Sequence, residues 1–183
     1  MRASLEHPEV FARLYDRHAA VIHRYAARRL GAEAADDVTA ETFLIAFRTR
    51  SRFDAARGTA RPWLFGIAGN LIGKQRRSEV RALRALARTG RDPVAESWSD
   101  RADERLSAQA VQKELAGALA RLSAGDREVL LLIAWAELSY QETAEALGIP
   151  VGTVRSRLNR ARRKTRAVLG ADPTLVIDTA EAV

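Results

Sequence analysis

The stretch LSYQETAEALGIPVGTVRSRLNRARRK, residues 138–164, contains two short helical patterns separated by a turn. Ser139 and Glu142 have the spacing of a capping box, which satisfies free backbone N–H groups at the start of a helix. Gly148 offers the permissive backbone that a tight turn needs, and Pro150 suits the first turn of a second helix. The stretch therefore predicts a helix, a turn and a second helix.

The second helical pattern separates an apolar side from a basic, polar side. Residues 155–166 contain seven basic residues and no acidic one. A core stripe is expected at the spacing i, i+4, i+7 and i+11, and its members are Val154, Leu158, Ala161 and Thr165. The residues expected on a different, outward face are Arg155, Ser156, Asn159 and Arg160, with Arg162, Arg163 and Arg166 beside them.

Two short helices with a glycine turn, the second presenting Arg, Ser and Asn outward, are typical of a DNA-reading helix-turn-helix. Arginine and asparagine bond bidentately to guanine and adenine edges in the major groove, while flanking arginines neutralise phosphates. The alternatives are a solvated basic helix and a helix that lies on a membrane surface. The agreement of cap, turn, core stripe and polar face favours DNA reading.

The composition supports a basic, globular, thiol-free protein. The 183 residues carry a formal net charge of +7 with a pI near 10.6, and 47% are hydrophobic. Such a charge favours polyanionic partners. Cysteine is absent, which excludes disulfides and thiolate chemistry. No apolar run is long enough for a transmembrane helix, and the first ten residues lack the apolar segment of a signal peptide, so we expect a cytoplasmic protein without membrane insertion.

Charge is unevenly placed along the chain. Residues 48–88 hold eleven basic residues against two acidic ones, and residues 91–104 then hold five acidic residues against two arginines. The acidic stretch also contains proline and serine and shows little apolar periodicity, so it is interpreted as a flexible linker. We expect an N-terminal domain at 8–87, a linker at 88–106, a C-terminal domain at 107–169 and a disordered tail at 170–183.

Nearly every other segment has helical periodicity. Apolar residues recur three and four apart in residues 11–25, 38–47 and 63–71, and again from Leu115 to Leu122 and from Val129 to Ile133. No segment alternates with a period of two. The predicted fold class is all-α, with two small domains: an N-terminal helical bundle and a C-terminal helix-turn-helix.

Three motifs, in their order along the chain, resemble the sigma-70 family of bacterial transcription initiation factors, in its small two-domain extracytoplasmic-function group. The stretch 138–162 is similar to the family's −35-reading motif. DDVTAETFLIAFR resembles the helix that docks on the polymerase clamp, and RPWLFGIAGNLIGKQRR the segment that melts and holds the −10 element. Departures from the family pattern are Ala40 in place of Gln, Phe47 in place of Trp and Lys74 in place of Asp.

The resemblance implies a factor that binds core RNA polymerase through its clamp region and directs it to one class of promoter DNA. An anti-sigma factor is a further partner that the sequence leaves undecided. The residues expected at the −35 element are Thr153, Arg155, Ser156, Asn159, Arg160 and Arg163. Those expected at the −10 element are Arg57, Arg61, Trp63, Asn70, Arg76 and Arg77, with residues 54–61 as the loop that captures a flipped base. Those expected to bind polymerase are Asp37, Glu41, Phe43 and Phe47.

Packing roles compete with some of these assignments. The two phenylalanines, Trp63 and Ile67 are each candidates for the domain core. A plain helix-turn-helix regulator without a sigma role is the alternative function, but it leaves the basic, Trp-containing segment 61–77 unexplained.

An enzyme is disfavoured. The three histidines lie without metal-ligand spacing, and Gly69, Gly73 and Lys74 match a phosphate loop incompletely. No cofactor, metal or catalytic residue is expected.

Overall fold

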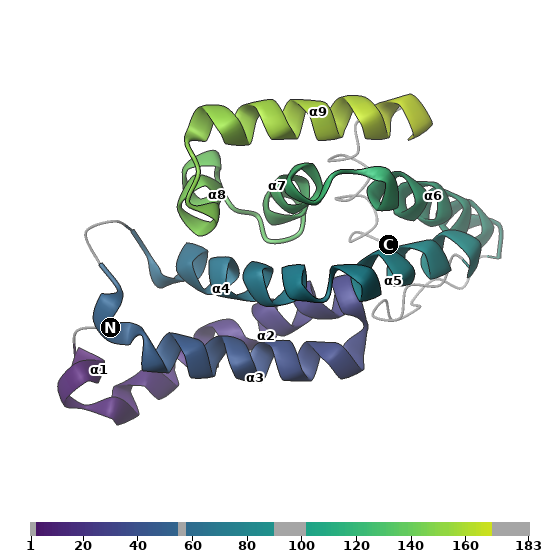
Figure 1. Ribbon diagram of the computed structural model, residues 1–183. Coiled ribbons are helices and arrows are strands. Elements are labelled where there is room, and N and C mark those ends of the chain that lie inside the picture. Colours follow the sequence, from purple (N-terminus) through teal and green to yellow (C-terminus); the bar gives the residue numbers. More distant parts are fainter. Residues whose placement is uncertain (1–2, 55–57, 90–101, 170–183) are drawn as a thin grey trace.

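The computed structural model describes residues 3–54, 58–89 and 102–169, and within these ranges it contains helices and no strand (Figure 1). The expected linker residues 90–101 and the tail 170–183 lie outside the described residues. The predicted all-α class is confirmed. The elements are α1 (Ala3–Glu6), the 3-10 turn η1 (Pro8–Phe11), α2 (Ala12–Leu30), α3 (Ala32–Arg48), the 3-10 turn η2 (Arg50–Arg52), α4 (Ala60–Lys74), α5 (Arg76–Thr89), α6 (Ala102–Arg121), α7 (Ala124–Ala134), α8 (Tyr140–Leu147) and α9 (Val151–Leu169).

Helices α2, α3 and α4 form the body of the N-terminal domain. Gly31 joins α2 to α3 with φ of 93°, a left-handed conformation that favours glycine. Ile22 of α2 and Leu64 of α4 are fully buried, and the rings of Tyr25 and Phe65 meet edge to face with centroids 5.2 Å apart. The three helices are therefore held together by one apolar and aromatic core.

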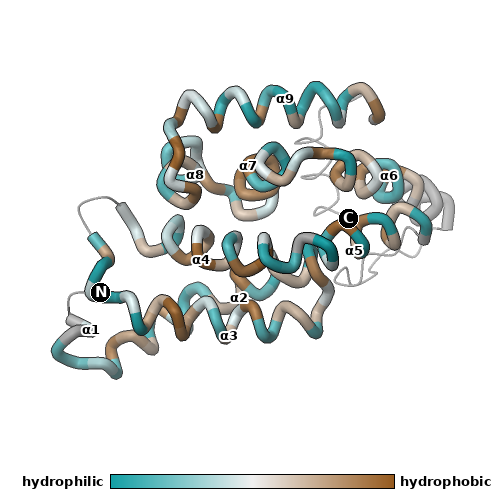
Figure 2. Tube along the Cα trace, in the orientation of Figure 1, coloured by the Kyte–Doolittle hydropathy of each residue, from teal (hydrophilic) through white to brown (hydrophobic). Residues whose placement is uncertain are grey.

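Helices α6 to α9 form the C-terminal domain around α7. Four consecutive residues of α7, from Val129 to Leu132, are completely buried, so neighbours cover α7 on several sides. The expected core stripe of α9 is confirmed, since Val154, Leu158 and Ala161 are at most 3% exposed. Figure 2 shows hydrophilic segments along the outer helices, whereas hydrophobic segments concentrate between the helices.

The local signals at 138–150 are confirmed. Ser139 caps α8 by accepting from the Glu142 backbone N–H at 3.1 Å, and the Glu142 carboxylate accepts from the Ser139 N–H at 2.9 Å. Gly148 ends α8 with φ of 61°. Ser123 likewise caps α7 by accepting from the Asp126 N–H. These sequence-local features fix where α7 and α8 begin and where α8 ends.

The two domains pack directly on each other. Helix α4 lies in the middle of the molecule, with α2 and α3 on one side and α7 and α8 on the other, and α5 runs alongside α6 (Figure 1). None of the helices in the described part of the chain is long and apolar enough to cross a membrane.

Helix α3 presents acidic residues outward and phenylalanines inward. Phe43 is only 5% exposed, and its ring lies edge-on to Tyr15 with centroids 4.8 Å apart. Phe47 is half-buried against Phe11, at 5.3 Å between centroids. Of the two roles expected for Phe43, polymerase binding and core packing, its burial therefore supports core packing.

Phe43→Ala is expected to lower the free energy of unfolding by about 3–5 kcal/mol, because it removes a buried aromatic ring and leaves a cavity. Leu44→Ala, at a neighbouring position that is 40% exposed, is the control and is expected to change it by less than about 1 kcal/mol. Urea titration followed by circular dichroism measures both. Equal destabilisation by the two substitutions would contradict the assignment of Phe43 to the core.

Candidate nucleic-acid interface

The outer surface of α9 carries exposed groups that are suited to DNA. Arg155, Asn159 and Arg163 are exposed, and together with Tyr140 of α8 they line a shallow hollow on this surface. Arginine and asparagine both offer paired hydrogen-bonding groups that match base edges. The buried stripe on the opposite side of α9 fixes which way these side chains point.

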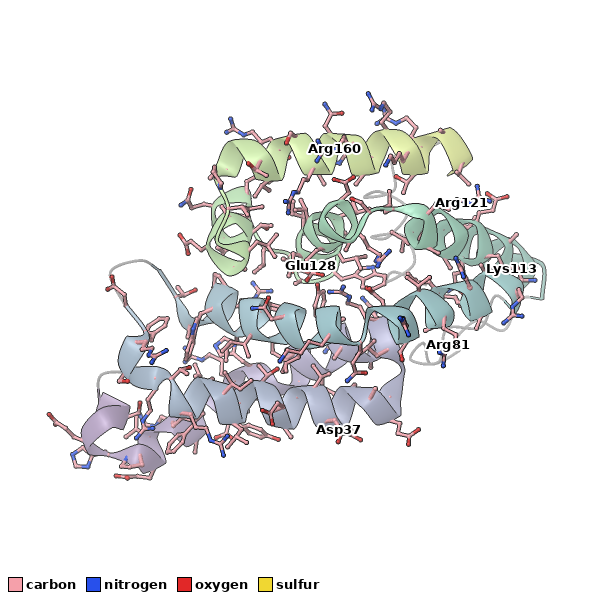
Figure 3. All side chains as sticks on the ribbon, in the orientation of Figure 1. Asp37, Arg81, Lys113, Arg121, Glu128 and Arg160 are labelled. Carbon is pink, nitrogen blue, oxygen red and sulfur yellow. The ribbon has the colours of Figure 1, made fainter. Side chains whose placement is uncertain are left out.

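Three other residues expected on this surface are engaged within the protein. Arg160 donates from Nε and Nη2 to Oδ1 of Asp126 in α7, at 3.2 and 3.1 Å. Figure 3 shows Arg160 on α9, in the layer next to α7. Ser156 is exposed and donates its hydroxyl to the Thr153 carbonyl at 3.0 Å, while Thr153 itself is half-buried. Arg160 is exposed, as expected, with its side chain 49% accessible, and its guanidinium also pairs with the buried Asp126 carboxylate.

Among the residues expected at the −10 element, some are exposed and others contact neighbouring residues of the protein. Asn70 and Arg77 are exposed. Arg61 instead donates from Nη2 to the Ala136 carbonyl at 2.7 Å, and half-buried Trp63 packs on Phe53 with ring centroids 5.2 Å apart.

The roles of Arg57 and Arg76 at the −10 element stay predictions. Arg57 lies outside the described residues, and Arg76 is placed only as the first residue of α5. The exposed members of the set, Asn70 and Arg77, thus lie near the end of α4 and the start of α5.

A stripe of arginines on α5 continues this basic surface beyond the predicted set. Arg77, Arg81, Arg84 and Arg88 fall at i, i+4, i+7 and i+11, are all exposed, and line one hollow. Glu79, the acid of the same helix, is buried on another side of it. Of the four arginines, only Arg77 was predicted from the sequence to bind DNA, although the helical spacing of the four indicates a common face. We call this set the α5 arginine stripe.

Each of the three histidines has charged neighbours. His7 and His23 lie beside Glu9 and Asp36, at 3.4 and 3.1 Å. Burial, with Arg17 and Arg61 nearby, lowers the pKa of His18. Within the described residues no group of three or more His, Asp or Glu side chains is placed to hold a metal ion.

Comparison with known families identifies both domains. Residues 14–93 match the model of sigma-70 region 2, and residues 112–165 match the model of sigma-70 region 4. The chain belongs to the sigma-70 family. Among its curated relatives is the ECF RNA polymerase sigma factor SigL of Mycobacterium tuberculosis, 38% identical over 157 residues that cover 85% of this chain and 86% of SigL. The chain is thus a transcription initiation factor of the extracytoplasmic-function group.

Other relatives support the same assignment. The RNA polymerase sigma factor NccH of Alcaligenes xylosoxydans xylosoxydans is 32% identical over 171 residues, covering 92% of this chain and 91% of NccH. The solved structure of CnrH in complex with the cytosolic domain of CnrY superposes with a TM-score of 0.63 at 30% identity, covering 93% of this chain and 94% of the other. RpoE of Bartonella quintana, solved with the anti-sigma factor NepR, shares the fold with a TM-score of 0.62 at 23% identity, covering 90% of this sigma factor and 99% of RpoE.

The two arginines of α9 are expected to respond differently to substitution. Arg155→Ala should weaken binding to a −35 duplex by about 1–3 kcal/mol and relax sequence preference at one base pair, because its exposed guanidinium is free to meet a base edge. Arg160→Ala should instead lower the free energy of unfolding, because it leaves the buried Asp126 without its nearest partner. Fluorescence anisotropy with matched and mismatched duplexes, beside thermal unfolding, separates the effects. A sequence-independent loss for Arg155→Ala would assign that residue to phosphate instead.

Proposed function

We propose that this sigma factor reads the −35 element with the outer surface of α9 and binds and melts the −10 element with α4 and α5. The proposal rests on the exposed side chains of Arg155, Asn159 and Arg163. The opposite side of α9 is buried in the domain core, so these side chains face outward. Arg155 and Asn159 are assigned to base edges and Arg163 to phosphate. Ser156 and Thr153 lie at the same end of α9, and Arg160 positions the helix through Asp126.

At the −10 element, exposed polar and basic groups are assigned to the DNA backbone and aromatic groups to unstacked bases. Asn70 and Arg77 are the first proposed contacts to the DNA backbone, and the other arginines of the α5 arginine stripe add further contacts. Along a helix, residues four apart are separated by about 6 Å, which is close to the spacing of phosphates along a strand. Trp63 remains the stacking candidate, because its ring is only partly covered. Arg57 and Arg76 complete the proposed set.

The outward side of α3 is the proposed docking surface for core RNA polymerase. Asp37, Glu41 and Leu44 are all exposed on it, and Figure 3 shows Asp37 on the side of α3 away from α7 and α9. An exposed leucine among carboxylates gives an apolar contact surrounded by charge, as in protein interfaces. Phe43 and Phe47 support this surface from beneath.

Membership of the family supports the remaining features of the proposal. The domains are proposed at 8–87 and 107–169, and the protein is proposed to act in the cytoplasm without catalysing a reaction of its own. Since CnrH and RpoE were solved with CnrY and the anti-sigma factor NepR, an anti-sigma factor is a proposed partner here too. A helix-turn-helix regulator without a sigma role is not favoured, because a region 2 domain accompanies the DNA-reading one.

Run-off transcription with purified core polymerase tests the function. Transcripts are expected from a genomic promoter library only when the chain is added, and mapped start sites should share −10 and −35 sequences. Glu41→Arg should reduce both transcript yield and capture by core polymerase about tenfold or more, because it reverses one charge of the docking surface. Asp16→Arg, the same reversal of charge at an exposed site of α2, is the control. Tight promoter binding by the chain without polymerase would favour the regulator alternative.

The α5 arginine stripe is expected to contribute to the salt dependence of DNA binding. Removing two phosphate contacts with Arg81→Ala and Arg84→Ala should reduce the slope of log affinity against log salt by about 1–2, because fewer counterions are released. The paired change Arg13→Ala and Arg24→Ala, at exposed positions of α2, should leave the slope unaltered. Promoter affinity of the polymerase holoenzyme, measured at four salt concentrations, gives each slope. If the parent and both double variants gave the same slope, the α5 arginine stripe would not contact DNA phosphates.

A further inference from the structure

Asp126 of α7 is a buried carboxylate that faces the DNA-reading helix α9. Its side chain is 5% exposed. Oδ1 accepts from Nε and Nη2 of Arg160 at 3.2 and 3.1 Å, and Oδ2 lies 3.9 Å from Nζ of Lys164. Between residues 155 and 166, α9 holds seven basic residues and no acidic one. Asp126 therefore brings to this stretch of α9 a negative charge that the stretch itself lacks.

The two partner cations lie at the edge of the DNA-reading surface. Each residue of an α-helix is rotated by about 100° from the one before it. Arg160 and Lys164 are four residues apart, so they form one row, between the exposed Asn159 and Arg163 on one side and the buried Ala161 on the other. Their side chains are 49% and 51% exposed. Both cations are thus open to solvent from outside, while a carboxylate attracts them from beneath.

The start of α7 would repel these cations if it carried no acid. A helix N-terminus has a partial positive charge, and α7 begins at Ala124 with Gly125 and Asp126 in its first turn. A Cβ placed on Gly125 would lie 3.0 Å from Nη1 of Arg157, so a third cation of α9 approaches the same turn. The hydroxyl of Ser123 caps this turn by accepting from the Asp126 N–H. The Asp126 carboxylate is directed at the cations of α9 instead.

A cation that is held by a carboxylate contributes less to sequence-independent DNA binding than a free one. Such binding arises because cations that meet phosphates release counterions, whatever the base sequence. For Arg160 to meet a phosphate it must leave Asp126, and a buried charge that loses its partner is strongly destabilising. Asp126 thus occupies the place that a phosphate oxygen would take, and it lowers the attraction of α9 for DNA of any sequence.

Binding at the −35 element depends on these two cations less than binding to random DNA does. The proposed base-reading residues, Arg155 and Asn159, form their hydrogen bonds to base edges in one register of α9 in the groove. In that register only the phosphates within reach pair with the edge cations, whereas on random DNA α9 is free to shift until its cations meet phosphates. Holding Arg160 and Lys164 therefore weakens binding to random DNA more than binding to the −35 element.

We propose that Asp126 is a specificity-determining residue of this sigma factor: it holds Arg160 and Lys164 at the edge of α9 and thereby raises the preference for the −35 element over random DNA. This inference rests on the proposed reading of the −35 element by α9. Asp126 acts through the two cations and is a positioning residue, with no proposed contact to DNA of its own. The preference thus depends on a residue of α7, outside the helix that reads the bases.

Asp126→Asn tests the proposal, because the amide keeps an oxygen for Arg160 but removes the negative charge. The full chain is titrated by fluorescence anisotropy at four salt concentrations with two duplexes of about 20 base pairs. One duplex carries the −35 sequence taken from the mapped start sites, and the other a scrambled sequence of the same composition. On the scrambled duplex the substitution should steepen the slope of log affinity against log salt by about 1–2 and tighten binding about tenfold, because up to two cations are freed. Binding to the −35 duplex should tighten less than about threefold.

Glu114→Gln, the same loss of one negative charge at an exposed position of α6, is the control and should keep the slope and both affinities of the parent chain. Circular dichroism on heating checks that each variant is folded. A merely structural role for Asp126 would lower the unfolding temperature while it left the salt slope and the preference between duplexes unaltered. That result overturns the proposal.

A second pair of substitutions tests the same point without changing Asp126. Arg163 and Lys164 are neighbouring exposed residues, and of the two Lys164 is the one beside Asp126. Arg163→Gln should reduce the salt slope on the scrambled duplex by about 0.9, the value for one lost phosphate contact. Lys164→Gln should reduce it by less than about 0.3, because Asp126 already holds its ammonium group. Equal reductions would show that Lys164 meets a phosphate in the parent chain and would overturn the proposal, even if Asp126→Asn did not fold.

The proposed function and the role of Asp126 fail in different ways. A parent chain that binds both duplexes equally rejects the proposed −35 reading by α9. A parent chain that prefers the −35 duplex, with the same salt slope for Asp126→Asn as for the parent, retains that reading and rejects the role of Asp126 alone.

Discussion

The approach of α4 to α8 depends on Gly66, whose missing side chain lets a helix of one domain touch the backbone of the other. Because α4 packs on α2 and α3 with Leu64, Phe65 and Ile72, and on α8 with Gly66, none of its residues from Ala60 to Gly69 is exposed. That explains a feature of the sequence. Up to Gly69 the segment RPWLFGIAGNLIGK has almost no polar stripe, as expected of a helix that is covered on all sides.

Local signals predicted the helix-turn-helix because every one of them acts within a few residues. The capping box, Gly148 and the core stripe each depend on neighbours along the chain, and each formed as expected. The packing of Phe43 and the pairing of Arg160 could not be predicted from local patterns. A phenylalanine on an amphipathic helix gives no sign of whether the ring meets Tyr15 or a partner protein. Likewise, the pairing of Arg160 depends on Asp126, which lies 34 residues away in sequence and is brought near only by the packing of α7 on α9.

The burial of Arg29 and Glu79 was still harder to predict from the sequence. Arg29 lies in a run of basic residues near the end of α2, and Glu79 is one of two acids among eleven basic residues, so both suggest a solvated surface. An isolated acid in a basic segment was the available signal, since a carboxylate surrounded by cations attracts them as partners. Its partners are 48 and 50 residues away, and no local pattern connects them.

The contact between the two domains combines an apolar surface with buried ion pairs. Helix α4 packs on α8 at Gly66, while Arg29 pairs with Glu128 at 2.7 Å and Arg127 with Glu79 at 2.9 Å across the same contact. The attraction within a buried ion pair is largely offset by the cost of removing each charge from water, so the pairs contribute little net affinity. They make the contact specific instead, because a buried charge that loses its partner is strongly destabilising. The apolar surface therefore supplies most of the affinity between the domains, and the ion pairs select the arrangement in which they meet.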